Sequence, residues 1–153
     1  MIVRVFGAGK LPASARRPRL IAAAARAALG PAARKPGELN IVFLDRRAMR
    51  KINRRFLGHD WDTDVIAFPY PPTPTLPHKG VGKSKGGGPF GDIFISADQA
   101  RKQAAELGHP PRTEVLTLAV HGALHLAGHE DTTAAGKRRM FARQEGLVRR
   151  LRA

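Results

Sequence analysis

The stretch that decides the fold reads TEVLTLAVHGALHLAGHED and runs from Thr113 to Asp131. Up to Ala127 it is rich in apolar residues at helical spacing and contains no proline, which predicts a buried helix. Gly128 then supplies a residue that tolerates a positive φ, so we expect the helix to end there and the chain to fold back. The rest of the chain is expected to pack around this helix.

Two histidines on this helix, His121 and His125, are four residues apart, so their side chains project from one helical face. Three further donors follow the expected turn: His129, Glu130 and Asp131. Two imidazoles and a third donor leave one coordination position open, which is typical of a catalytic zinc rather than a closed structural site. The alternative interpretation is a pair of ordinary core histidines.

The spacing of His121, His125 and Asp131 invites comparison with zinc peptidases, in which a glutamate directly after the first histidine is the general base. Here that position is Gly122, which has no side chain and transfers no proton. The sequence therefore predicts the zinc geometry without the peptidase chemistry.

Three motifs occur along the chain in a characteristic order: TDVIAF at 63–68, GDIFIS at 91–96 and HGALHLAG at 121–128. Together they resemble the signatures of the YbeY family of bacterial metal-dependent endoribonucleases, and the resemblance covers nearly the whole chain. It implies a zinc-dependent, single-strand-specific endoribonuclease with one Zn²⁺ per chain, acting in ribosomal RNA maturation. It further implies 3′-end processing of small-subunit ribosomal RNA, ribosome quality control, and contact with the ribosome or ribosomal proteins.

Two positions depart from the family pattern. The family usually has a third histidine ligand at the position of Asp131, and His129 stands two residues earlier. Zinc accepts a carboxylate oxygen at about the same distance as an imidazole nitrogen, so we expect Asp131 as third ligand, with His129 as the alternative. A functional arginine of the family falls at Leu57, and Arg54 or Arg55 is the candidate to replace it.

The two upstream motifs each carry an aspartate, Asp64 and Asp92. We expect these carboxylates to support the metal ligands from outside, as hydrogen-bonded partners of a metal site do. The alternative is that each one caps a turn or ends a strand. A bound metal can activate water or stabilise charge on the phosphate, so attack by water and by the neighbouring 2′-hydroxyl are both compatible with this chemistry.

Charge is the dominant feature of the composition. The chain has 27 Lys and Arg residues against 12 acidic residues, a net charge of +15, and a pI near 11.6. Such a field attracts polyanions, which favours an RNA substrate. The expected contacts lie on one basic helix face: Arg46, Arg47, Arg50 and Lys51. The alternative is a solvated surface.

Aromatic residues make up only 6% of the chain, so an aromatic platform for stacking bases is not expected. A second function remains compatible with the charge: a basic protein that binds RNA or the ribosome and has a structural or lost metal site. A measurement of bound metal distinguishes the two functions, because the nuclease needs one metal per chain and a binding protein needs none.

The predicted fold is an α+β (α/β-like) single domain over 1–153, with about five helices packed against a mixed sheet of about four strands. The expected strands are 2–6, 39–44, 63–68 and 92–96. The expected helices are 18–29, a segment capped by Asp45 with an apolar face of Met49, Ile52 and Phe56, then 97–107, 113–127 and 132–151. A flexible loop rich in Pro, Gly and Lys is expected at 69–89.

The expected location is the cytoplasm, with no membrane partner. No apolar run reaches membrane-spanning length, and the N-terminal residues alternate like a strand rather than a signal peptide. Cysteine is absent, so neither a disulfide nor a thiolate metal ligand is available.

Overall fold

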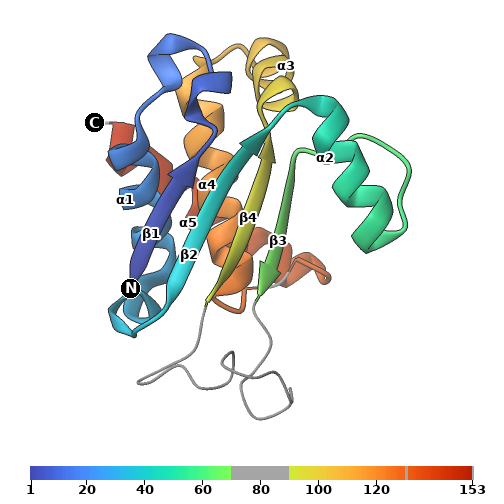
Figure 1. Ribbon diagram of the computed structural model, residues 1–153. Coiled ribbons are helices and arrows are strands. Elements are labelled where there is room, and N and C mark those ends of the chain that lie inside the picture. The colour runs from blue at the N-terminus through green and yellow to red at the C-terminus, as the bar shows by residue number, and fades with distance from the viewer. Residues whose placement is uncertain (70–89, 130, 153) are drawn as a thin grey trace.

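The computed structural model describes residues 1–69, 90–129 and 131–152, and it shows a four-stranded mixed sheet (Figure 1). The strand order is β1-β2-β4-β3. Three strands are parallel: β1 (Ile2–Phe6), β2 (Glu38–Leu44) and β4 (Gly91–Ser96). The edge strand β3 (Val65–Pro69) runs antiparallel to β4. The predicted α+β class with a mixed sheet is confirmed.

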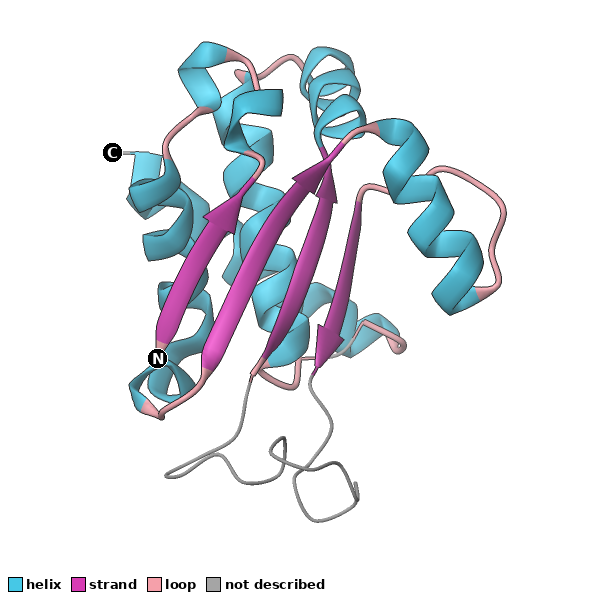
Figure 2. Ribbon diagram, in the orientation of Figure 1, coloured by secondary structure: helices cyan, strands magenta, loops and turns pink. Residues whose placement is uncertain are grey.

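The helices are α1 (Pro18–Leu29), α2 (Arg46–Ile52), α3 (Ala97–Leu107), α4 (Pro111–Leu126) and α5 (Ala134–Arg152). Short 3₁₀ turns lie at Ala8–Lys10, Ala13–Ala15 and Gly30–Arg34. Figure 2 shows α1, α4 and α5 together on one face of the sheet. Apart from α2, every expected strand and helix is found within two residues of its predicted ends.

Local capping signals explain why these helices begin and end where they do. The carboxylate of Asp45 accepts a hydrogen bond from the Ala48 amide at 2.8 Å, and the Ser96 hydroxyl accepts one from the Gln99 amide at 3.1 Å. Gly108 closes α3 with a φ of 72°, a conformation that glycine adopts without steric cost.

Helix α4 is the centre of the molecule. It packs against β3, β4, α1, α3 and α5, and most of its residues are buried on every side, as expected for a helix that is apolar all round. A Cβ added to Gly122 would lie 2.7 Å from Cγ2 of Ile93 on β4, so this glycine permits a close approach of helix and sheet. The approach places His121 and His125 beside the edge strand β3.

The predicted apolar face of α2 was wrong at Phe56. The α-helix ends at Ile52 and continues as a π turn, Asn53–Leu57. The wider turn shifts the later side chains out of the helical repeat, so Met49 is buried while Phe56 is 61% exposed. The Phe56 ring instead meets the edge of Phe68 on β3, with centroids 5.6 Å apart.

The loop predicted at 69–89 starts at Pro69, the last residue of β3, and its other residues lie outside the described part of the chain. None of the described helices is both long enough and apolar enough to cross a membrane.

Candidate metal centre

The last turns of α4 and the segment after it bring three donors together. One ligand atom each from His121, His125 and Asp131 lies within 4.8 Å of the other two. The Nε2 atom of His125 is 3.2 Å from Nε2 of His121 and 3.5 Å from Oδ2 of Asp131. These three residues, called the triad below, are the set expected from the sequence.

Beyond the turn at Gly128, Asp131 joins the two histidines and His129 does not. Gly128 has a φ of 101°, and the amide of His129 donates to the Leu124 carbonyl at 3.0 Å, which folds the chain back against the helix end. The ring of His129 is exposed and does not join the donor cluster found among the described residues. Glu130, the remaining candidate donor, lies outside those residues.

The environment of His125 favours a neutral imidazole. Burial lowers the pKa of His125 below its usual value of 6.5, and the charge of His121 lowers it further, while Asp131 opposes both effects. A neutral ring keeps a lone pair for a cation, so protons compete less for this donor.

Gln144 on α5 fixes the orientation of His121. Its Oε1 atom lies 2.7 Å from Nδ1 of His121 and can accept only if that nitrogen carries the proton. The lone pair then belongs to Nε2, which faces His125, as in metal sites whose histidines are held by an outer hydrogen bond. Sequence reasoning missed Gln144, although a signal existed: it is a polar residue between Met140 and Val148 on the apolar face of α5.

Two clefts meet at the triad. The α4–α5 cleft, about 600 Å³, is lined by residues that include His121, Asp131 and Asp64. The α4–β3 cleft, about 570 Å³, is lined by residues that include His121, His125 and Trp61. The two clefts adjoin at His121, and each is lined by one further member of the triad.

A sequence model of the family described as "Endoribonuclease YbeY" matches residues 15–152, which is nearly the whole chain. The chain belongs to the YbeY family. A curated relative with that name from Elusimicrobium minutum is 48% identical over 133 residues, covering 87% of both chains. One from Moorella thermoacetica is 39% identical over 131 residues, covering 83% of this chain and 78% of the relative.

A structural relative supports the fold. The solution structure of a Thermotoga maritima protein matches with a TM-score of 0.61 at 22% identity, covering 98% of this chain and 89% of the other. The two proteins therefore share one fold over nearly the whole of this chain.

Of the two aspartates in the upstream YbeY motifs, only Asp64 lines a cleft that reaches the triad. Asp64 lines the α4–α5 cleft, its backbone carbonyl accepts from the Ser96 amide at 2.9 Å, and no hydrogen bond or ion pair engages its carboxylate among the described residues. Successive residues of a strand face opposite sides of the sheet, and Ile93 faces α4, so Asp92 faces the other side. There the Asn40 amide donates to the Asp92 carboxylate at 3.1 Å. Asp92 therefore lies on the other side of the sheet from the triad.

The residues expected to replace the YbeY arginine lie outside the α4–β3 cleft, whereas Leu57 lines it. The Nε atom of Arg54 is 3.2 Å from the Asp60 carboxylate, and the Arg55 guanidinium lies 5.6 Å from the centroid of the Phe56 ring. Neither Arg54 nor Arg55 lines either of the two clefts.

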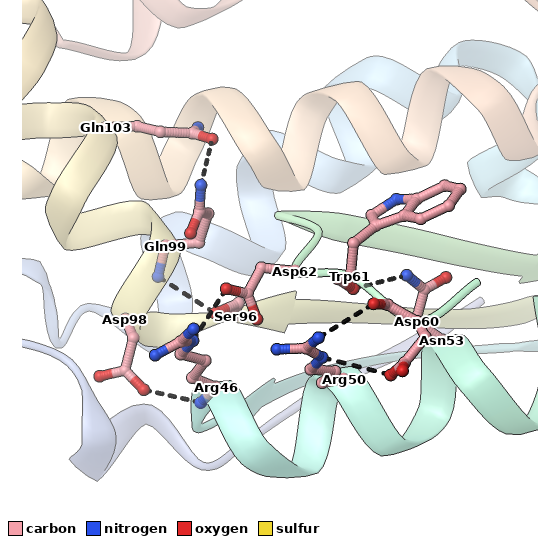
Figure 3. A network of polar contacts seen from close by, with 10 residues as sticks. All are labelled: Arg46, Arg50, Asn53, Asp60, Trp61, Asp62, Ser96, Asp98, Gln99 and Gln103. Carbon is pink, nitrogen blue, oxygen red and sulfur yellow. Dashed lines mark hydrogen bonds and ion pairs between the residues drawn. The ribbon is translucent and has the colours of Figure 1, made fainter.

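The basic face of α2 is partly neutralised by a loop that follows it (Figure 3). Arg46 pairs with Asp62 at 2.8 Å, and Arg50 pairs with Asp60 at 3.4 Å. Within the described part of the chain, no ion pair engages Arg47 or Lys51, so these two keep their charge for an external anion.

Proposed function

We propose that this chain is a metal-dependent endoribonuclease that cleaves single-stranded ribosomal RNA precursors, with one Zn²⁺ held by His121, His125 and Asp131. The observation that carries the proposal is the triad at the junction of two clefts in a member of an endoribonuclease family. An endonuclease needs room for the strand on both sides of the cleaved bond, and this arrangement provides it.

The donor set fits zinc. Two imidazole nitrogens and one carboxylate oxygen are ligands that zinc takes in catalytic sites, where three protein ligands leave a position for water or substrate. The lowered pKa of His125 favours a neutral ring, and the hydrogen bond that His121 donates to Gln144 leaves the Nε2 lone pair of His121 free. When bound, the metal supplies a Lewis acid for water or for the phosphate.

The chain's own residues supply orientation and proton transfer. Gln144 holds the His121 ring, and Asp131 contributes a negative charge at the triad. We assign to the Asp64 carboxylate the role of accepting a proton from the attacking hydroxyl, because it lines the cleft with His121 and Asp131. We assign no catalytic role to Asp92, which lies on the other face of the sheet, or to Arg54 and Arg55, which line neither cleft.

Phosphate binding is assigned to basic residues on both sides of the triad. Arg47 and Lys51 on α2 form one group, with Arg46 and Arg50 in support, and Lys137 and Arg149 line the α4–α5 cleft. A ribosomal RNA substrate places the activity in the cytoplasm. It also makes the ribosome or ribosomal proteins the proposed partners.

Metal analysis combined with an RNA cleavage assay tests the proposal. Purified protein, never exposed to chelator, is expected to hold about one zinc per chain and to cleave single-stranded RNA. His125→Ala and Asp131→Ala should each lower metal content and cleavage, whereas His129→Ala should change both little.

Two results would overturn the proposal. RNA binding without a stoichiometric metal or cleavage would identify a basic RNA-binding protein instead. A loss of metal in His129→Ala but not in Asp131→Ala would transfer the third ligand to His129.

A further inference from the structure

The single tryptophan of the chain is exposed in the α4–β3 cleft, beside the triad. Trp61 is 57% exposed, and its indole stacks on the ring of His59 with centroids 4.3 Å apart and an interplanar angle of 13°. His59 and Trp61 line the same cleft as His121 and His125. An exposed pair of stacked rings next to a metal centre is a feature that fold stability does not explain.

The segment that carries these rings is held by its backbone. The buried amide of Asn53 donates to the Trp61 carbonyl at 2.9 Å, and Arg50 donates to the Asp60 carbonyl at 3.0 Å. The His59 amide donates to the Asn53 carbonyl at 3.3 Å. Figure 3 shows the indole directed away from this polar network. The loop is therefore held by hydrogen bonds to its backbone, none of which involves the indole ring.

The charges around the rings permit an RNA strand to approach. The loop has two acidic side chains, Asp60 and Asp62, and three arginines of α2 and the π turn pair with them. These ion pairs leave the segment with a net positive charge, so the carboxylates do not repel a phosphate backbone.

We propose that Trp61, backed by His59, is a stacking platform for one unpaired base of the RNA strand next to the cleaved bond. The inference rests on the proposed function and adds a substrate subsite to it. Every base has an aromatic face, so such a contact selects unpaired over paired nucleotides without reading sequence. Because the loop is already ordered, little conformational entropy is lost on binding.

The low aromatic content had argued against a stacking surface. One platform needs only two rings, however, and the composition does not reveal that they are adjacent and exposed. The proposed subsite thus accounts for single-strand preference with one base rather than an extended aromatic sheet.

Intrinsic fluorescence tests the subsite directly, because Trp61 is the only tryptophan. Titration of the zinc-loaded protein with a short 2′-O-methyl oligouridylate, which resists cleavage, is expected to quench the emission saturably. Anisotropy of a labelled copy should give the same Kd. A blunt RNA duplex of equal length should leave the emission unchanged, because its bases are already stacked.

Substitutions complete the test. Trp61→Ala is expected to weaken oligouridylate binding about tenfold with metal content and melting temperature unchanged, and Trp61→Phe should recover most of the loss. Phe6→Ala, which removes an exposed ring from β1 at the opposite edge of the sheet, should bind as the unmodified protein does.

The outcomes separate this subsite from the proposed function. Unchanged emission on saturation with oligouridylate, or equal affinity in Trp61→Ala, would overturn the platform while metal binding and cleavage stand. Equal quenching by the duplex would also overturn the platform, because it would show that RNA is held near Trp61 by general electrostatic attraction and not by stacking of an unpaired base. Quenching by single strands in a protein that neither holds zinc nor cleaves RNA would keep the platform and overturn the nuclease.

Discussion

Gln144 connects α5 to the triad through one hydrogen bond with His121. The side chain is buried, only 7% exposed, and its carbonyl oxygen fixes which ring nitrogen of His121 carries the proton. A residue that holds a ligand in one tautomer contributes to metal affinity without touching the metal.

We expect Gln144→Leu to weaken zinc binding about 10–100-fold, because His121 loses the partner that orients its ring. Competition with a chromogenic chelator measures this affinity. Gln144→Glu should restore much of it, since a carboxylate also accepts from Nδ1. Gln103→Leu is the control, because Gln103 donates to Glu114 at 2.7 Å and does not contact the triad. Equal zinc affinities in Gln144→Leu and the unmodified protein would refute the orienting role.

The close packing of α4 on β4 depends on Gly122. This residue occupies the position at which zinc peptidases have their catalytic glutamate, and the structure gives a packing reason for its small size. The nearest atom to an added Cβ is Cγ2 of Ile93, which is attached directly to a rigid β-branched carbon. The neighbour therefore has little freedom to move aside.

Gly122→Ala is expected to destabilise the protein by about 1 kcal/mol, a fall in Tm of about 2–4 °C. Overpacking costs about 1–3 kcal/mol, and the better helix propensity of alanine returns about 1 kcal/mol. Gly146→Ala in α5 is the matched control, because nothing lies within 4 Å of its added Cβ and only the propensity gain applies. Thermal unfolding that shifts both variants upward would show that Ile93 yields to the new methyl group.

Helix and strand positions followed from local signals, whereas contacts between distant segments did not. Pro18, Asp45, Ser96 and Gly108 mark helix ends by their own chemistry, so a single sequence is enough to find them. The π turn after Ile52 has no such signal, so helical spacing predicts the wrong side for the Phe56 side chain.

In the candidate site, too, the residues that are close in sequence were predictable, and those brought together by packing were not. His121, His125 and Asp131 are close in sequence, and a helix followed by a glycine turn is enough to bring them together. Gln144 reaches His121 only through the packing of α5 on α4, which periodicity alone does not specify. Asp92 lies on the face of the sheet away from α4, whereas Asp64, just before β3, lines the α4–α5 cleft, and the two motifs alone do not predict this difference.

The molecule as a whole combines a strong positive charge with a triad open on two sides. The net charge of +15 attracts any polyanion, and the two clefts determine where a bound strand can approach the triad. Within α2, the residues differ in availability, since Arg46 and Arg50 pair with aspartates while Arg47 and Lys51 do not pair within the described part of the chain. Because some arginines pair with aspartates, fewer basic side chains are available to bind RNA phosphates than the count of Lys and Arg indicates.

We expect the affinity for single-stranded RNA to fall steeply with salt, and the double change Arg47→Ala, Lys51→Ala to reduce the slope. Each lost phosphate contact should lower the slope of log K against log salt by about 0.7. Anisotropy titrations of a labelled oligonucleotide at several salt concentrations measure it. Removal of the same charge from α1 by Arg19→Ala and Arg26→Ala is the control, because α1 lies beside β1 at the sheet edge away from β3. Equal reductions in both double variants would mean that RNA responds to the overall charge and not to contacts made by α2.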